Sequence, residues 1–189
     1  IDPIGSRDLD DALSIRKNET KYIITTYISD VVAILEQYQL WNRLTSQVAT
    51  LYTRDKIFSL LPRSLSNNIC SLLEGQIRNV ICTEFTIEDN EIIGVKLYSK
   101  KVLITTNYYY EENRLVCLEC YQELYKVLQN LKIPFKYEIN NSHDVVEVLM
   151  ILTNYYSAKE LAKKKAGIFR KVEFKGDNTS NGELEEFLS

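Results

Sequence analysis

Histidine is almost missing from this chain, in which His143 is the single one among 189 residues. It stands at the start of a predicted helix, where a surface position is expected. No Ser-His or Cys-His pair can be argued from it. The sequence therefore gives no sign of a hydrolase built on a histidine-activated nucleophile.

Cysteine is sparse as well, with four residues, Cys70, Cys82, Cys117 and Cys120. Cys117-x-x-Cys120 is a lone C-x-x-C, and a structural zinc site normally takes four ligands. The pair is therefore interpreted as two positions of an amphipathic helix. The other two cysteines lie in apolar stretches, and reduced, buried thiols are typical of an intracellular protein.

The chain also lacks a strong net charge and a long apolar run. A net charge of -3 gives no global attraction for nucleic acid, so any binding of a polyanion must be local, through a metal ion or a basic patch. No stretch approaches the roughly 20 apolar residues of a membrane span, and no membrane association is expected. The first residue is Ile1 and no signal-peptide pattern precedes it, so we expect a segment of a longer protein.

What the chain does contain is a globular composition, with 45% hydrophobic and 26% charged residues. Two pairs of alternating segments predict β-hairpins. The first pair is 12–16 with 21–29, and the second is 79–87 with 92–99.

Helical spacing of apolar residues predicts helices over 40–52, 117–132 and 142–165. A further strand is expected over 167–174 and the start of another helix over 183–189. The mixture predicts an α+β fold with a mostly antiparallel sheet, and all 189 residues are assigned to part of one domain.

The longest predicted helix, 142–165, carries end signals that suit a helix dipole. Ser142 is a candidate N-cap, Asp144 lies in the first turn, and Lys163 to Lys165 gather at the end. Apolar residues nearly encircle it, which predicts a central, buried helix.

Four aspartates lie close together at the start of the chain, at positions 2, 8, 10 and 11. Asp8 and Asp10 are two apart, so they share one side of an extended segment. Asp2 can return to them if the intervening residues form a loop, and Gly5 permits such a turn. Clustered carboxylates stay ionised together only if a cation neutralises them.

Oxygen-only ligands suit Mg²⁺ or Mn²⁺, and Mg²⁺ usually completes its shell with water and substrate phosphates. This points to phosphoryl chemistry. A solvated acidic loop that caps the next element is the plainer alternative. A calcium loop of the EF-hand type is set aside, because Arg7 and Leu13 occupy the places of its Gly and Glu.

The pattern I-D-P-x-x-x-x-D-x-D-D-A-L resembles the catalytic signature of the RNB family, the ribonuclease II and ribonuclease R exoribonucleases. Residues 27–31, Y-I-S-D-V, are similar to a strand of that family in which His stands in place of Tyr27. Residues 51–78, 145–154 and 168–172 also resemble family segments. The resemblance covers nearly the whole chain and corresponds to the first half of the family's catalytic domain.

The resemblance implies a Mg²⁺-dependent enzyme that hydrolyses single-stranded RNA from the 3′ end and releases nucleoside 5′-monophosphates. It implies that Asp2, Asp8, Asp10 and Asp11 hold metal, and that Asp10 is the catalytic residue tied most directly to cleavage.

It also implies RNA-binding roles for three residues. Tyr52 would stack on a base, Glu147 would accept a hydrogen bond from the terminal ribose, and Arg170 lies in the Arg-containing strand. RNA-binding domains are expected to flank this segment.

The chain departs from the family at two positions. Val148 replaces a second glutamate, and Thr105 stands where bacterial members have a tyrosine, with Tyr108 to Tyr110 just beyond. The alternative is therefore a catalytically silent RNB-like protein that binds RNA or serves a structural role in a larger assembly.

Overall fold

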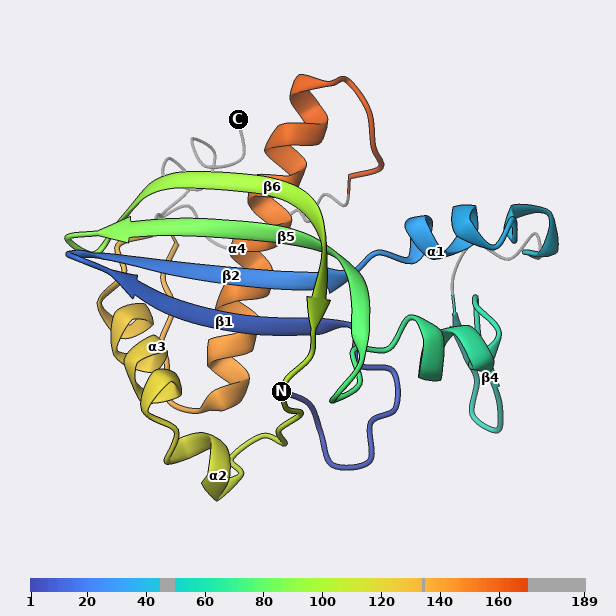
Figure 1. Cartoon of the computed structure of the whole chain (residues 1–189), viewed down its shortest axis with the longest axis horizontal. Coiled ribbons are helices and arrows are strands. Elements are labelled where there is room, and N and C mark those ends of the chain that lie inside the picture. Colours follow the sequence, from blue (N-terminus) through green and yellow to red (C-terminus); the bar gives the residue numbers. More distant parts are fainter. Residues whose placement is uncertain (45–49, 134, 170–189) are drawn as a thin grey trace, which may run out of the picture.

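A four-stranded antiparallel sheet forms the centre of the computed structural model, which describes residues 1–44, 50–133 and 135–169. The strand order is β1-β2-β5-β6. The strands are β1 (Asp11–Asn18), β2 (Lys21–Ser29), β5 (Ile77–Glu88) and β6 (Glu91–Leu103). Both predicted hairpins and the α+β class are confirmed (Figure 1).

The β5–β6 hairpin turns through two residues, Asp89 and Asn90, with φ of 51° and 63°. Two successive positive φ angles match the twist of the flanking strands, and Asp and Asn tolerate that conformation better than most residues. The turn chemistry thus sets the register of the two longest strands.

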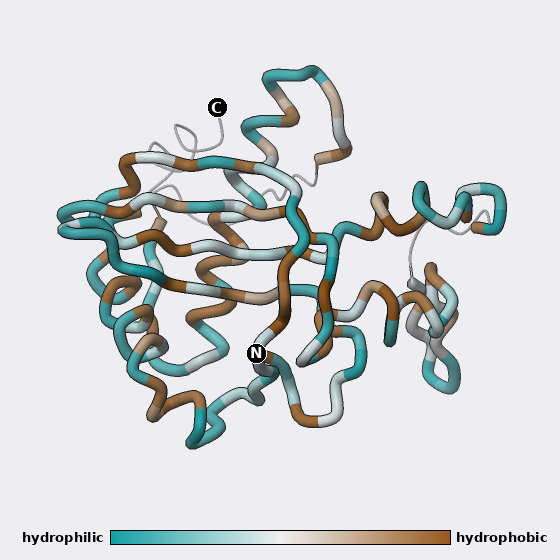
Figure 2. The backbone as a smooth tube through the Cα atoms, in the orientation of Figure 1, coloured by the Kyte–Doolittle hydropathy of each residue, from teal (hydrophilic) through white to brown (hydrophobic). Residues whose placement is uncertain are grey.

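Two helices, α3 (Glu119–Asn130) and α4 (Ser142–Lys163), pack on one face of this sheet (Figure 1). Ile24 and Phe85 of the sheet share a core with Leu128 and Leu149 of the helices, and all four are at most 1% exposed. Apolar positions recur on the strands and on the helices beneath them (Figure 2). This core holds the strands whose ends carry the candidate site.

Helix α4 is the predicted longest helix, but its ends and its burial differ from the prediction. Its N-cap is Asn141, whose side chain accepts a hydrogen bond from the Asp144 N–H at 3.0 Å, while Ser142 bonds to Glu111 from a distant segment. Buried residues end at Thr153, because the second half of the helix projects past the sheet (Figure 1). The central, buried position is therefore confirmed for the first half only.

A smaller unit extends from one end of the sheet (Figure 1). It contains α1 (Val31–Gln37), the 3₁₀ turn η1 (Trp41–Arg43), β3 (Leu51–Tyr52), β4 (Ile57–Phe58) and the π-helical turn η2 (Leu65–Ile69). A short helix, α2 (Asn113–Val116), precedes α3.

The helix predicted over 40–52 is wrong at both of its described ends. Its start is only a 3₁₀ turn, and Leu51 and Tyr52 pair with β4 because the Thr53 N–H donates to the Lys56 carbonyl at 2.9 Å and closes a turn. Leu40 and Leu44 pack instead against a small cluster of buried residues. Residues 45–49 lie outside the described residues.

Most of the elements predicted for the end of the chain lie outside the described residues. Residues 167–169 form no strand, and the remainder of the strand predicted over 167–174 and the helix predicted over 183–189 lie outside the described residues. No helix in the described part of the chain combines the length and the apolar character that a bilayer crossing requires.

Candidate catalytic and metal site

Leu9 sets the direction of the aspartates on either side of it. It is 7% exposed and packs with a second buried cluster, Leu72, Val80, Cys82 and Ile104. Because side chains alternate along an extended segment, a buried Leu9 turns Asp8 and Asp10 outward. Both line one cavity, as their spacing in the sequence predicts.

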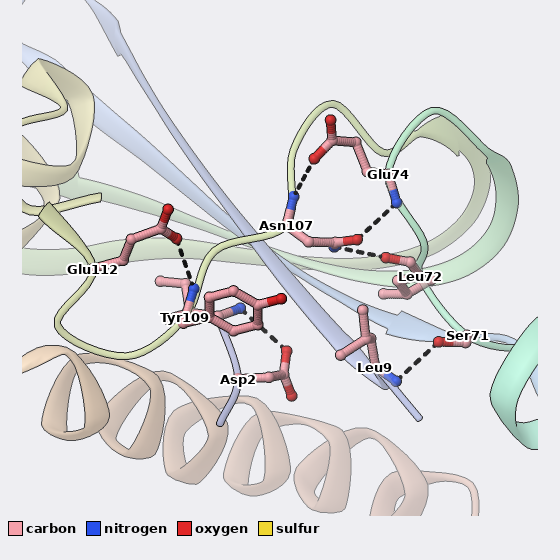
Figure 3. A network of polar contacts seen from close by, with 9 residues as sticks. Asp2, Leu9, Ser71, Leu72, Glu74, Asn107, Tyr109 and Glu112 are labelled. Atoms are coloured by element: carbon pink, nitrogen blue, oxygen red, sulfur yellow. Dashed lines mark hydrogen bonds and ion pairs between the residues drawn. The ribbon is translucent and has the colours of Figure 1, made fainter. Parts of the chain in front are cut away.

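Ser71 fixes the backbone of this aspartate loop (Figure 3). Its hydroxyl accepts a hydrogen bond from the Leu9 N–H at 3.0 Å and donates one to the Arg7 carbonyl at 2.8 Å. The Leu72 N–H adds a 2.8 Å bond to the Leu9 carbonyl. Ser71 is fully buried, so these bonds are shielded from water.

Arg78 in turn holds the Ser71 segment in place. Its guanidinium donates to the Ser71 carbonyl at 2.8 Å and to the Asn68 carbonyl at 3.0 Å. The loop that carries the aspartates thus rests on a second loop that is itself tied to β5.

Asp2 returns to the other aspartates by pairing with a distant segment. Its N–H donates to the Tyr108 carbonyl at 3.1 Å, and the Tyr110 N–H donates to the Asp2 carbonyl at 3.2 Å. The intervening residues form the predicted loop, in which Gly5 has φ of 87° and the Ser6 N–H donates to the Pro3 carbonyl.

Asn107 anchors the segment that pairs with Asp2 (Figure 3). Its side chain donates to the Leu72 carbonyl at 2.9 Å and accepts from the Glu74 N–H at 2.7 Å. Asp2 and the loop behind Leu9 are therefore attached to the same short stretch of chain.

The Asp11 carboxylate is the least satisfied group of the cluster. Asp11 begins β1, and its Oδ2 atom is buried without a hydrogen-bond partner. Burial raises the pKa of Asp11, and the negative charges of Asp2 and Asp10 raise it further. The pKa of Asp10 is raised by burial first and then by Asp8 and Asp2, although solvent still reaches its side chain.

These residues fit a divalent cation with oxygen ligands. A cation would supply the missing partner of the Asp11 oxygen and offset the repulsion that raises the two pKa values. No three of the aspartates bring ligand atoms within 4.8 Å of one another in the described part of the chain. Mg²⁺ commonly takes only one or two carboxylates beside water and phosphate.

Glu147 lies on the exposed side of α4, near its start. Its ligand atoms and those of His143 and Asp144 lie within 4.8 Å of one another, with 4.0 Å between His143 Nδ1 and a Glu147 oxygen. The His143 ring lies 5.3 Å from the Tyr110 ring, centre to centre. Glu147, the predicted ribose-binding glutamate, is therefore linked to the Asp2 segment through His143 and Tyr110.

Tyr110 is the residue of this region that motif spacing did not identify. Burial raises its pKa, and the charges of Asp11 and Asp2 raise it further, so it lies in the field of the aspartates. The run Tyr108 to Tyr110 beyond Thr105 was the only signal in the sequence.

Two predicted RNA-binding residues are not tested. The Tyr52 backbone lies in β3, but its side chain is outside the description, and Arg170 is outside the described residues. Both stay predictions.

Comparison with known proteins decides the family. The model of the RNB domain matches residues 1–115, more than half of the chain. The chain belongs to the RNB family. The match contains the four aspartates, the Ser71 loop and the segment that pairs with Asp2.

Curated RNB relatives agree over the same region. Ribonuclease R of Ureaplasma parvum is 35% identical over 101 residues, which are 52% of this chain and 14% of that protein. Exoribonuclease 2 of Vibrio parahaemolyticus is 31% identical over 106 residues, which are 54% of this chain and 16% of that protein. This RNB chain therefore spans a small part of the length of either relative.

Solved structures share the fold of the RNB chain. RNase R of Mycoplasma genitalium in complex with double-stranded RNA has a TM-score of 0.68 at 20% identity, covering 87% of this chain and 37% of that one. The same enzyme in complex with ribose methylated single-stranded RNA has a TM-score of 0.64 at 21% identity, covering 87% and 32%. At this identity the likeness establishes the fold alone.

Proposed function

We propose that this chain is part of the catalytic domain of a 3′-to-5′ exoribonuclease that uses Mg²⁺, or Mn²⁺ in its place. The substrate is single-stranded RNA and the products are nucleoside 5′-monophosphates. The observation that carries the proposal is the buried, unpartnered Asp11 oxygen beside Asp2 and Asp10, within a chain of the RNB family. RNA-binding domains elsewhere in the full protein would deliver the strand, and the protein would act inside the cell.

Asp2, Asp8, Asp10 and Asp11 would hold the metal. When bound, Mg²⁺ supplies activation of water and neutralisation of charge on the phosphate. Asp10 lines the cavity and is open to solvent, which favours it as the group that takes up a proton from the attacking water during hydrolysis.

Three residues would hold the RNA. Tyr52 would stack on a base, which suits an enzyme that tolerates any sequence, because every base offers an aromatic face. Glu147 is exposed, and its carboxylate could accept a hydrogen bond from a ribose 2′-OH, a contact that distinguishes RNA from DNA. Arg170 would pair with the phosphate backbone.

The second candidate is an RNB-like protein that binds RNA without cutting it. Two observations favour it: no three of the described aspartate carboxylates meet within 4.8 Å, and Val148 is buried where the resemblance places a second glutamate. Catalysis would then be absent while RNA binding persists.

The experiment compares the full-length protein with its Asp10→Asn variant on single-stranded RNA with Mg²⁺. We expect hydrolysis to fall by about 10²–10⁴-fold, the usual contribution of a positioned acid-base group, with RNA affinity unchanged or higher. Asp89→Asn is the matched control, because Asp89 lies in the exposed β5–β6 turn and should leave the rate unchanged. An unsubstituted protein that binds RNA but hydrolyses none with Mg²⁺ or Mn²⁺ would favour the second candidate.

A further inference from the structure

We propose that Arg63 binds the phosphate of a nucleoside 5′-monophosphate in the cavity that Asp8 and Asp10 line. This inference rests on the proposed function and names the residue that recognises its product. The comparisons with known proteins give no role to Arg63.

The cavity lies between the aspartate loop and the smaller unit, and its volume is about 540 Å³. That is within the range of about 300–1,000 Å³ for small-molecule sites. The lining includes Asp8, Asp10, Ser29 and Cys70. It also includes residues from the part of the smaller unit that follows η1, namely Thr50, Ser59, Leu60, Leu61, Arg63, Ser66 and Asn67.

Charges of both signs line the cavity. Arg63 is the only cation among its lining residues, and Asp8 and Asp10 are the only anions. No ion pair joins Arg63 to any carboxylate in the described part of the chain, so the aspartates do not neutralise it. A phosphate that is bound both by a metal ion at Asp8 and Asp10 and by the Arg63 guanidinium complements both charges.

Local hydrogen bonds hold the turn that carries Arg63. The Pro62 carbonyl accepts from the Leu65 N–H at 2.8 Å and from the Ser66 N–H at 3.1 Å. Leu65 is buried and anchors this turn in the third apolar cluster. A guanidinium on a fixed backbone presents its planar fork at small entropic cost, which favours bidentate binding of phosphate.

Polar side chains of the smaller unit also line the cavity. Thr50 is fixed by the Leu60 N–H, which donates to its Oγ1 at 3.1 Å, and Ser66 donates to Asn67 Oδ1 at 2.8 Å. Hydroxyl and amide groups that line the same cavity as a guanidinium can share the oxygens of one phosphate with it. A nucleoside 5′-monophosphate is the species of that chemistry which the proposed reaction releases at this place.

The test measures binding of adenosine 5′-monophosphate and of adenosine to the full-length protein by calorimetry with Mg²⁺. We expect Arg63→Ala to weaken binding of the monophosphate by about tenfold to a hundredfold and to leave binding of adenosine unchanged. Arg63→Lys should fall between, because it keeps the charge and loses the fork. Arg54→Ala, at an exposed residue outside the cavity lining, is the matched control and should bind like the unsubstituted protein.

Two results would overturn the inference: equal monophosphate affinity with and without Arg63, or an equal loss for adenosine. Arg63 is exposed and forms no ion pair with any described residue, so its variants should have the same melting temperature as the unsubstituted protein. The Lys variant still tests the inference if the Ala variant alters the fold. RNA hydrolysis separates the two proposals. Hydrolysis with monophosphate binding independent of Arg63 rejects this inference alone, whereas Arg63-dependent binding without hydrolysis rejects the nuclease alone.

Discussion

Replacement of Asp11 by Asn tests the metal assignment through stability, without any assay of activity. The Asp11 Oδ2 atom is buried without a partner, and burial followed by the charges of Asp2 and Asp10 raises the pKa of this carboxyl. An ionised, unpartnered group destabilises the metal-free fold at neutral pH. Asn keeps the shape and removes the charge.

The magnitude follows from the cost of a buried polar group without a hydrogen bond, which is about 1–3 kcal/mol and more for a charged one. Asn keeps part of that cost, so we expect Asp11→Asn to stabilise the metal-free protein by about 1 kcal/mol at pH 7. Mg²⁺ at a hundred times its Kd should stabilise the unsubstituted protein by about 2.7 kcal/mol. The variant should lose most of that response.

The pH dependence has a definite sign. The folded-state pKa of Asp10 and that of Asp11 both lie above the ordinary value of 3.8 for an aspartate, so the folded protein holds protons that the unfolded chain has released. The stability of the metal-free protein should therefore fall as pH rises above about 3.8 and level off above the raised pKa values. Mg²⁺ should cancel the fall at neutral pH, and Asp11→Asn should reduce it.

The assay is thermal unfolding of the full-length protein from pH 3 to pH 8, with and without Mg²⁺. Asp89→Asn, in the exposed turn, should keep the full response to Mg²⁺. The reasoning is refuted if Asp11→Asn destabilises the metal-free protein at pH 7 and still responds to Mg²⁺ as the unsubstituted protein does.

Three further predictions concern the structure around the site. Ser71→Ala removes the buried hydroxyl that bonds twice to the aspartate loop, and it should lower the free energy of unfolding by about 1–3 kcal/mol in denaturant titrations and weaken Mg²⁺ binding; unchanged values of both would contradict the role given to Ser71. Thr26→Val and Thr153→Val each remove one partner of a buried 2.7 Å hydrogen bond, while Thr26 keeps a 3.5 Å bond to the Thr83 carbonyl in the second variant. A double-mutant cycle should give a coupling of about 0.5–3 kcal/mol, and additive effects would exclude it. Hydrogen bonds from Ser142 lower the pKa of Glu111, so this pair should stabilise the fold above pH 4.5 and lose that effect as pH falls through the lowered pKa. Glu111→Gln should remove this pH dependence, which is measured by following the melting temperature as a function of pH.

The sheet and the shared side of Asp8 and Asp10 followed from local sequence alone. Alternation of apolar residues predicted both hairpins, because a half-buried strand needs a period of two. The same alternation around Leu9 placed Asp8 and Asp10 on one side, and the buried Leu9 agrees with it.

What the sequence could not provide depends on contacts between distant residues. Ser142 is a residue type that often caps helices, yet its hydroxyl donates to the Glu111 carboxylate. The side chain of Asn141 caps the helix instead. The apolar residues Leu40 and Leu44, which gave the pattern of a helix, pack instead against a small buried cluster. No local sequence pattern predicts that cluster. The cavity that joins Arg63 to the aspartates likewise exists only once the smaller unit folds against the loop.

The most direct test of the central claim follows the 3′-terminal nucleotide of a single-stranded RNA that carries its label there. The full-length protein with Mg²⁺ should release the label first as a nucleoside 5′-monophosphate, before any shorter labelled oligonucleotide is formed. Removal of Mg²⁺ by a chelator should stop the release, and its return should restore it. Labelled oligonucleotides as the first products, or RNA that is bound and left whole, would contradict the account.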